Sequence, residues 1–150
     1  MIKDLTDAQM DHLLLTQSYG RLGCGQGEEL HIVPLSYVYD GTYLYAHSKE
    51  GMKISLMRKQ PQVTFQVDEI QDVNNWWSII IWAEYEELTS DPLKAEAMRL
   101  LDDRFAAFSS SKALHPTPPG PHMTGFAEKA AQPIFFRLKV LRKSGRSERP

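Results

Sequence analysis

Residues 30–48 read LHIVPLSYVYDGTYLYAHS, and this stretch decides the fold. The run from Leu30 to Tyr39 and the run from Thr42 to His47 are rich in β-branched and aromatic residues, which favour strands. The pair Asp40-Gly41 between them is a strong short-range hairpin signal. Pro34 has no amide hydrogen, so we expect it at a sheet edge, at a bulge, or where something other than a strand pairs.

Four more strands and three helices are predicted in the rest of the chain. Thr6 and Gln9 have the spacing of a capping box, which begins the first helix. Asp91-Pro92 supplies an N-cap acid and a proline at the first helical position. The strands are predicted over residues 19–24, 62–67, 76–88 and 133–141, the helices over 7–18, 52–59 and 91–108, and a turn over 68–75.

This inventory predicts a mainly β fold. Hairpin connections dominate, so a six-stranded antiparallel barrel with peripheral helices fits better than a parallel sheet. The length suits a single domain over residues 1–150. The N-terminal helix lies within residues 1–18, and residues 144–150 are expected to be a frayed basic tail.

Composition excludes several classes of protein. The net charge is −2, which argues against a general nucleic-acid binder, although the segment from Arg137 onward carries +5. The N-terminus does not resemble a signal peptide, and no run approaches the roughly 18 apolar residues of a membrane span. The single cysteine, Cys24, excludes an intrachain disulfide and favours a reducing compartment. We therefore expect a cytoplasmic protein without a membrane partner.

One segment has the composition of an anion site. His47-Ser48 ends a predicted strand, and residues 49–53 (KEGMK) lead into a predicted helix. A helix N-terminus offers free amide hydrogens and partial positive charge. Ser48 adds a hydroxyl, Lys53 adds a full charge, and Gly51 allows close approach of the backbone to a ligand. A surface loop with an N-cap serine explains the same residues, and composition alone favours that explanation.

An ordered set of motifs links the chain to a known family. The motifs are Gly20-Arg21-Leu22, residues 31–41 (HIVPLSYVYDG), residues 44–48 (LYAHS), Gly51-x-Lys53, residues 60–63 (QPQV) and Trp77-Ser78. In this order they resemble the pyridoxamine 5′-phosphate oxidase-like family of flavin-binding split barrels, closest to the branch with the nitroimidazole-resistance proteins. The resemblance covers about residues 19–88 and is weaker through the last predicted strand.

The resemblance implies a homodimer with FMN, or less often FAD, at the subunit interface. The strand with Val33-Pro34-Leu35-Ser36 would lie along the isoalloxazine ring, with His47 against the flavin. The positions of Ser48 and Lys53 would hold the phosphate, often with the serine matching Ser78. Gly51 beside the phosphate and Trp77 near the pocket above the ring complete the expected cofactor-binding set.

The sequence departs from the family pattern in places. His31, Trp77 and Ala83 stand where other residues are common, so the choice of substrate does not carry over. The arginine-rich substrate motif of the pyridoxamine phosphate oxidases proper is not found near the C-terminus.

These observations predict a flavin-dependent oxidoreductase with a small-molecule electron donor and acceptor, such as a nitro-compound reductase. A non-catalytic flavin- or haem-binding protein of the same fold is the alternative, and a module with a dead cofactor site is a third. No catalytic side chain is assigned, because the cofactor performs the electron transfer in a flavoprotein. No metal site is expected, since His115 and His122 lie in a proline-rich loop over residues 115–122 without a clear set of partners.

Overall fold

The computed structural model describes residues 1–111 and 132–150, with side chains described outside residues 107–111. Strands and helices follow one another as β1 (Lys3–Asp4), α1 (Asp7–Thr16), β2 (Tyr19–Cys24), β3 (His31–Ser36), β4 (Val38–Tyr39), β5 (Tyr43–Ser48), α2 (Met52–Lys59), β6 (Gln62–Asp72), β7 (Asn75–Glu87), α3 (Asp91–Ser111) and β8 (Ile134–Glu148). One 3-10 turn, Gly27–Glu29, lies between β2 and β3. None of the helices in the described part of the chain is long and apolar enough to cross a membrane.

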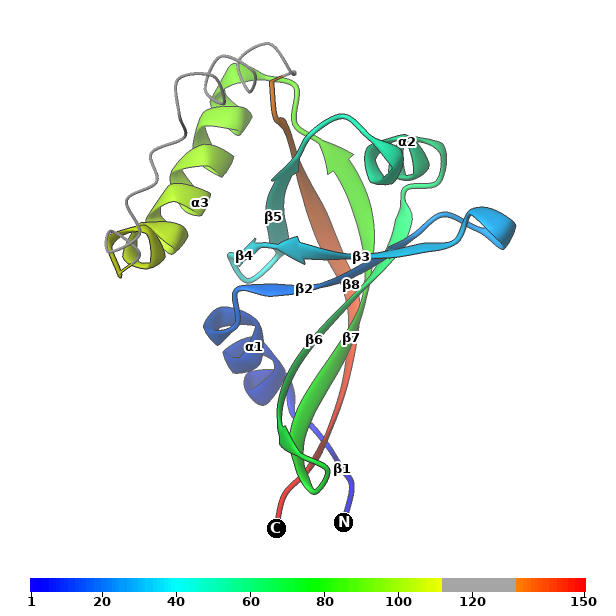
Figure 1. Cartoon of the computed structure of the whole chain (residues 1–150), viewed down its shortest axis with the longest axis vertical. Coiled ribbons are helices and arrows are strands. Elements are labelled where there is room, and N and C mark those ends of the chain that lie inside the picture. Colours follow the sequence, from blue (N-terminus) through cyan, green and yellow to red (C-terminus); the bar gives the residue numbers. More distant parts are fainter. Residues whose placement is uncertain (112–131) are drawn as a thin grey trace.

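The strands form one antiparallel sheet in the order β3-β2-β6-β7-β8-β5-β4, with β1 paired to β8. Figure 1 shows β6, β7 and β8 as the long strands that curve around the core, with β2 and β3 crossing in front of them. The sheet is a half-barrel with three helices, so the predicted mainly β split barrel is confirmed.

Residues 1–111 and 132–150 contain eight strands, where six were predicted for the chain. The predicted strand over residues 30–39 is divided at Tyr37 into β3 and β4. The Tyr37 amide donates to Ser18 O at 3.0 Å and its hydroxyl donates to Leu14 O at 2.8 Å, so this residue bonds to the end of α1 instead of to a strand. The other extra strand, β1, has only two residues.

The predicted start of the first helix is confirmed. Thr6 Oγ1 accepts from the Gln9 amide, and the Gln9 side chain accepts from the Thr6 amide, which completes a capping box. The predicted hairpin is also present, since Gly41 has φ of 101° between β4 and β5. A positive φ of this kind is easily adopted only by glycine and a few polar residues.

Two predicted boundaries and one predicted helix cap were wrong. Residues 68–72 continue β6, because their backbone pairs with β7 as far as Asp72 opposite Asn75, and only Val73 and Asn74 form the turn. Residues 144–148 are not frayed, because they continue β8 opposite β7 and Gly145 is buried. At the start of α3, Ser90 Oγ accepts from the Leu93 amide, so the cap is Ser90 instead of Asp91.

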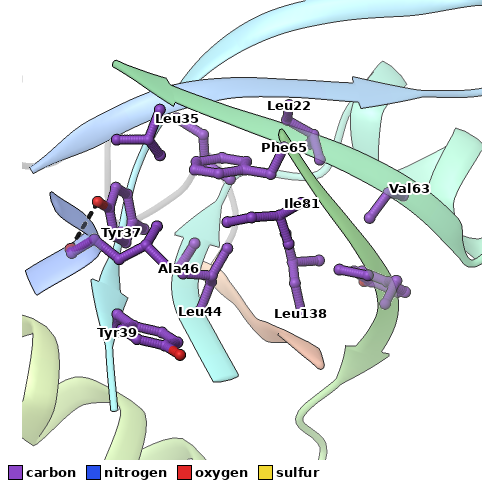
Figure 2. Packing of buried hydrophobic residues seen from close by; sticks show 14 of the residues in the cluster. Leu22, Leu35, Tyr37, Tyr39, Leu44, Ala46, Val63, Phe65, Ile81 and Leu138 are labelled. Carbon is purple, nitrogen blue, oxygen red and sulfur yellow. Dashed lines mark hydrogen bonds between the residues drawn. The ribbon is translucent and has the colours of Figure 1, made fainter. Parts of the chain in front are cut away.

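Two clusters of buried side chains fill the space inside the sheet. The larger cluster joins α1 and α2 to the inner face, and Tyr37 meets Phe65 edge to face with ring centroids 5.4 Å apart (Figure 2). The smaller cluster packs α3 against β5 and β8 through Tyr45, Leu101 and Phe135. Burial of these apolar side chains therefore holds α3 beside β5 and β8, close to the residues that begin α2.

Candidate functional site

A cavity of about 650 Å³ lies between β3, the end of β5, α2, α3 and the segment that begins β8. This volume is within the usual range of roughly 300–1,000 Å³ for small-molecule sites. Its lining residues are Pro34, Leu35, Ser36, His47, Lys53, Met98, Leu101, Asp102, Phe105, Pro133 and Phe135. Figure 1 shows α2 and α3 at the same end of the sheet, on either side of β5.

Lys53 lines this cavity, and Ser48, which ends β5 next to the lining residue His47, is hydrogen-bonded to it; we call this pair the anion corner. The Lys53 ammonium donates to Ser48 Oγ at 2.6 Å, and the Ser48 hydroxyl donates to Lys49 O at 3.0 Å. Ser48 is buried and Lys53 is half-buried, so water screens this corner less than an open surface. A charged donor and a hydroxyl at this spacing are suited to hold an anionic oxygen.

The N-terminus of α2 opens beside this corner. Gly51 is its N-cap and supplies no side-chain hydrogen bond, so the expectation of an N-cap serine was wrong. A Cβ added to Gly51 would approach only Lys49 O, at 3.9 Å. The first amide hydrogens of α2 have no partners within the helix and can donate to an anion.

The remaining wall of the cavity is mostly apolar. Leu35 is buried on β3, Leu101 and Phe105 come from α3, and Phe135 comes from β8. The His47 ring is exposed and lies 5.8 Å from the Phe135 ring, tilted by 57°. Such a wall is suited to a planar aromatic ligand, which gains by burying its faces against side chains of this kind.

Charge in the cavity comes from few side chains. Lys53 lies at the anion corner, and Asp102 on α3 is the carboxylate of the lining. Cys24, which ends β2, is buried; burial raises the pKa of its thiol, and the nearby Lys53 charge opposes this only in part. The thiol therefore stays protonated at neutral pH, and Cys24 behaves as a small buried hydrophobic side chain.

The structure brings together most of the residues that the sequence nominated. Pro34, Leu35, Ser36, His47 and Lys53 line the cavity, Ser48 ends β5, and Gly51 is the N-cap of α2. Pro34 lies on β3, at the edge of the sheet, as its missing amide hydrogen predicts.

Three nominated residues lie elsewhere in the same chain. Val33 packs against the larger core cluster, and so does Trp77. Ser78 Oγ accepts a hydrogen bond from Gln66 at 3.0 Å on the opposite face of β7 from the core. Trp77 and Ser78 lie near the β6–β7 turn, at the other end of the long strands from α2 and α3 (Figure 1).

The sequence reasoning missed the wall that α3 provides. Met98, Leu101, Asp102 and Phe105 follow the spacing of one helix face, and that periodicity predicts a buried face. It does not predict which strands the face meets. These residues face His47 and Lys53 because α3 packs against β5 and β8.

Residues 115–122, with His115 and His122, lie outside the described residues. Within residues 1–111 and 132–150, no group of three or more His, Cys, Asp or Glu side chains is arranged to hold a metal ion.

Comparisons with known proteins show the same fold. A solved structure of an FAD-binding protein from Mesorhizobium loti has a TM-score of 0.75 and 29% identity, and the match covers 100% of this chain and 98% of that one. An uncharacterised protein of Rhizobium meliloti (strain 1021) is 37% identical over 68 residues, which is 45% of each chain, so the match spans less than half of that relative.

Two more distant structures share the fold. A candidate 5-nitroimidazole antibiotic resistance protein from Bacteroides thetaiotaomicron has a TM-score of 0.68 at 15% identity, covering 98% of this chain and 89% of that one. A haem storage protein from Vibrio cholerae has a TM-score of 0.65 at 11% identity, and the match covers 91% of this chain and 90% of that one. The sequence profile of the pyridoxamine 5′-phosphate oxidase family matches residues 6–130. The chain therefore belongs to the pyridoxamine 5′-phosphate oxidase family.

Proposed function

We propose that the protein is a flavin-dependent oxidoreductase that binds FMN, with FAD as the alternative, in the cavity between β3, β5, α2 and α3. The observation that carries this proposal is the pairing of an anion corner at Ser48 and Lys53 with an apolar wall in one cavity. A flavin mononucleotide has the same two parts, a phosphate and a planar ring. The similar structure from Mesorhizobium loti is that of an FAD-binding protein, which supports a flavin as the cofactor without favouring FMN over FAD.

The described residues fit such a cofactor. Lys53, Ser48 and the open N-terminus of α2 at Gly51 would hold a phosphate. Leu35 and Phe135 would contact the ring system, and His47 beside Phe135 would face it. When bound, a flavin supplies the electron or hydride transfer, and the protein binds it, orients it and excludes water. No side chain of this chain is needed as a nucleophile.

The proposal includes a homodimer. Ser78, on the outer face of β7, lies too far along the strand to reach the cavity of its own chain, and we propose that it contributes to the cavity of a second copy, whereas Trp77 packs against the core of its own chain. The outer face of β2, β3, β6 and β7 is apolar enough to meet that copy, since Ile32 is 73% exposed and Ile80 is 45% exposed there. Exposed apolar patches of this kind mark interaction surfaces.

The substrate would be a small organic acceptor, with a nitro compound as one candidate, and the donor a reduced nicotinamide. An acceptor that enters beside the flavin would meet Met98, Leu101 and Phe105 and one carboxylate, Asp102. These residues suit a small, mostly apolar molecule, and we expect the reaction in the cytoplasm.

A non-catalytic carrier is the second candidate. His47 presents an imidazole on the cavity wall, and imidazole is a common axial ligand of haem iron. The likeness of fold to the haem storage protein of Vibrio cholerae makes haem the ligand to test beside flavin.

A visible absorption spectrum of the purified protein tests the proposal first. Two bands of an oxidised flavin, with FMN or FAD released on heating, are the expected result. Turnover with reduced nicotinamide then separates an enzyme from a carrier. A sharp Soret band would favour haem. A colourless protein that takes up neither FMN nor FAD would contradict flavin binding.

The anion corner has its own test. Lys53→Ala is expected to weaken FMN binding by about 1–3 kcal/mol, because it removes a charge-assisted contact to the phosphate. Lys59→Ala is the matched control, since Lys59 lies at the other end of α2 with its ammonium 3.8 Å from Glu29. Equal FMN affinity in the Lys53→Ala variant and the wild type would refute the phosphate role.

A further inference from the structure

Arg58 links the loop before α2, residues 49–51, to the sheet. Arg58 on α2 donates to Glu87 on β7 through Nε at 2.8 Å and Nη2 at 3.1 Å. The same guanidinium donates to both carboxylate oxygens of Glu50, the residue immediately before Gly51. Glu87 in turn accepts from the Tyr85 hydroxyl at 2.8 Å. The chain of contacts therefore runs from β7 through Arg58 to the residue beside the N-cap of α2.

We propose that Arg58 is a positioning residue for phosphate recognition: by holding Glu50 against β7, it fixes the loop from Ser48 to Gly51 in the shape that accepts a phosphate. This inference rests on the proposed function, since it concerns the same site. Arg58 itself does not line the cavity. Its effect on a ligand is therefore transmitted through the backbone of the loop.

The loop needs such an anchor. Ser48 ends β5 opposite Ile134 of β8, and its Oγ bonds to Lys49 O and to the Lys53 ammonium, both local partners, so the ladder holds Ser48 but not residues 49–51. Glu50 and Gly51 are exposed, and Gly51 has no side chain with which to contact the sheet. Among the described residues, the Glu50–Arg58–Glu87 bridge is the side-chain link from this loop to a strand that does not adjoin it in sequence.

Arg58 also neutralises two carboxylates near the anion corner. Hydrogen bonds from Arg58 hold the pKa of the Glu87 carboxyl below its usual range, so this carboxylate is ionised at neutral pH. Glu50 places a second carboxylate two residues from Ser48. Without Arg58, both negative charges would remain near a site proposed for an anion, and Glu50 would be free to turn toward it.

The test compares FMN with riboflavin, which has the same ring but no phosphate. For Arg58→Ala we expect FMN binding about tenfold weaker and riboflavin binding changed by less than about twofold, measured by quenching of flavin fluorescence. Arg58→Lys keeps the charge but does not bridge two carboxylates with a planar fork, so we expect an intermediate loss for FMN. Glu50→Ala breaks the loop side of the bridge and is expected to weaken FMN binding as well.

Arg99→Ala is the matched control, because Arg99 on α3 also bridges two carboxylates, Glu96 and Asp103, at the surface. We expect no change in affinity for either ligand in that variant. Equal losses for FMN and riboflavin in Arg58→Ala, or FMN binding unchanged in both Arg58→Ala and Glu50→Ala, would overturn the positioning role. A wild-type protein that binds neither ligand would overturn the proposed function and this inference with it.

Discussion

Glu86 and Arg137 form a cross-strand pair whose contribution depends on pH. They lie opposite each other on β7 and β8, and Arg137 donates to the two Glu86 oxygens at 2.8 and 3.0 Å. The guanidinium also lies 4.0 Å from the centre of the Tyr43 ring, which holds it in place. These hydrogen bonds lower the pKa of the Glu86 carboxyl below its usual range.

A carboxyl whose pKa is lowered in the folded state stabilises the fold above its unfolded pKa of about 4.3, and this contribution is lost as the pH falls through the lower folded value. Glu86→Gln should therefore be less stable than the wild type at about pH 7, and the difference should shrink toward zero at about pH 3. Urea unfolding at several pH values measures this. Since Glu86 is partly exposed, the effect is small, and a difference independent of pH would contradict it.

The candidate site could be predicted in the part that is local in sequence. Pro34, His47 and Lys53 lie within one hairpin and the helix that follows it, so their proximity follows from the chain path alone. The wall formed by Leu101 and Phe105 could not be predicted, since it depends on which strands α3 meets after a separation of about fifty residues. Residue types and their local spacing therefore indicated the anion corner, whereas the apolar wall depends on tertiary packing.

At the scale of elements, β8 extends further than its sequence suggests. Residues 144–148 are mostly polar and charged, which is typical of a frayed end. They nevertheless pair with β7 from Ile80 to Trp76, and Ser147 and Arg146 also pair with β1. The polar segment over residues 68–72 continues β6 for the same reason: the backbone ladder satisfies its own hydrogen bonds whether the side chains face a core or solvent.

Gly145 provides the test of this extended strand. It is buried, and a Cβ there would lie 2.9 Å from Leu5 Cδ1 and 3.0 Å from Met10 Sδ. Gly145→Val should therefore lower the free energy of unfolding by about 1–3 kcal/mol through overpacking. Ser144→Val is the control, because Ser144 is exposed on the same strand and its replacement should change stability by less than about 0.5 kcal/mol. Equal effects of the two variants on thermal unfolding would indicate that the strand end is not packed.

At the scale of the whole molecule, the outer face of β2, β3, β6 and β7 has no helix packed over it among the described residues, whereas α3 covers β5 and β8. α1 and α2 cover the inner face with the larger core cluster, whereas the outer face of β2, β3, β6 and β7 forms an open groove of about 580 Å³ with Ile32, Ile80 and Trp82 in its lining. Arg142 lies 3.9 Å from the Trp82 ring at the border of this groove. A polar rim around an apolar centre is the usual anatomy of an interface between proteins. A second copy of the chain is the proposed occupant, since it would also bring Ser78 to the cavity.

Ile80→Glu tests this arrangement, because a charge in the centre of a desolvated interface is strongly unfavourable. We expect the wild type to sediment as a dimer, and the variant as a monomer that retains its fold and loses most of its flavin affinity. Leu15→Glu is the control: Leu15 is exposed on α1, away from this face, and its variant should remain a dimer. A dimeric Ile80→Glu variant with wild-type affinity would exclude this face as the interface. A monomeric variant that still binds flavin tightly would show that the cavity is complete within one chain, and Ser78 would then have no part in it.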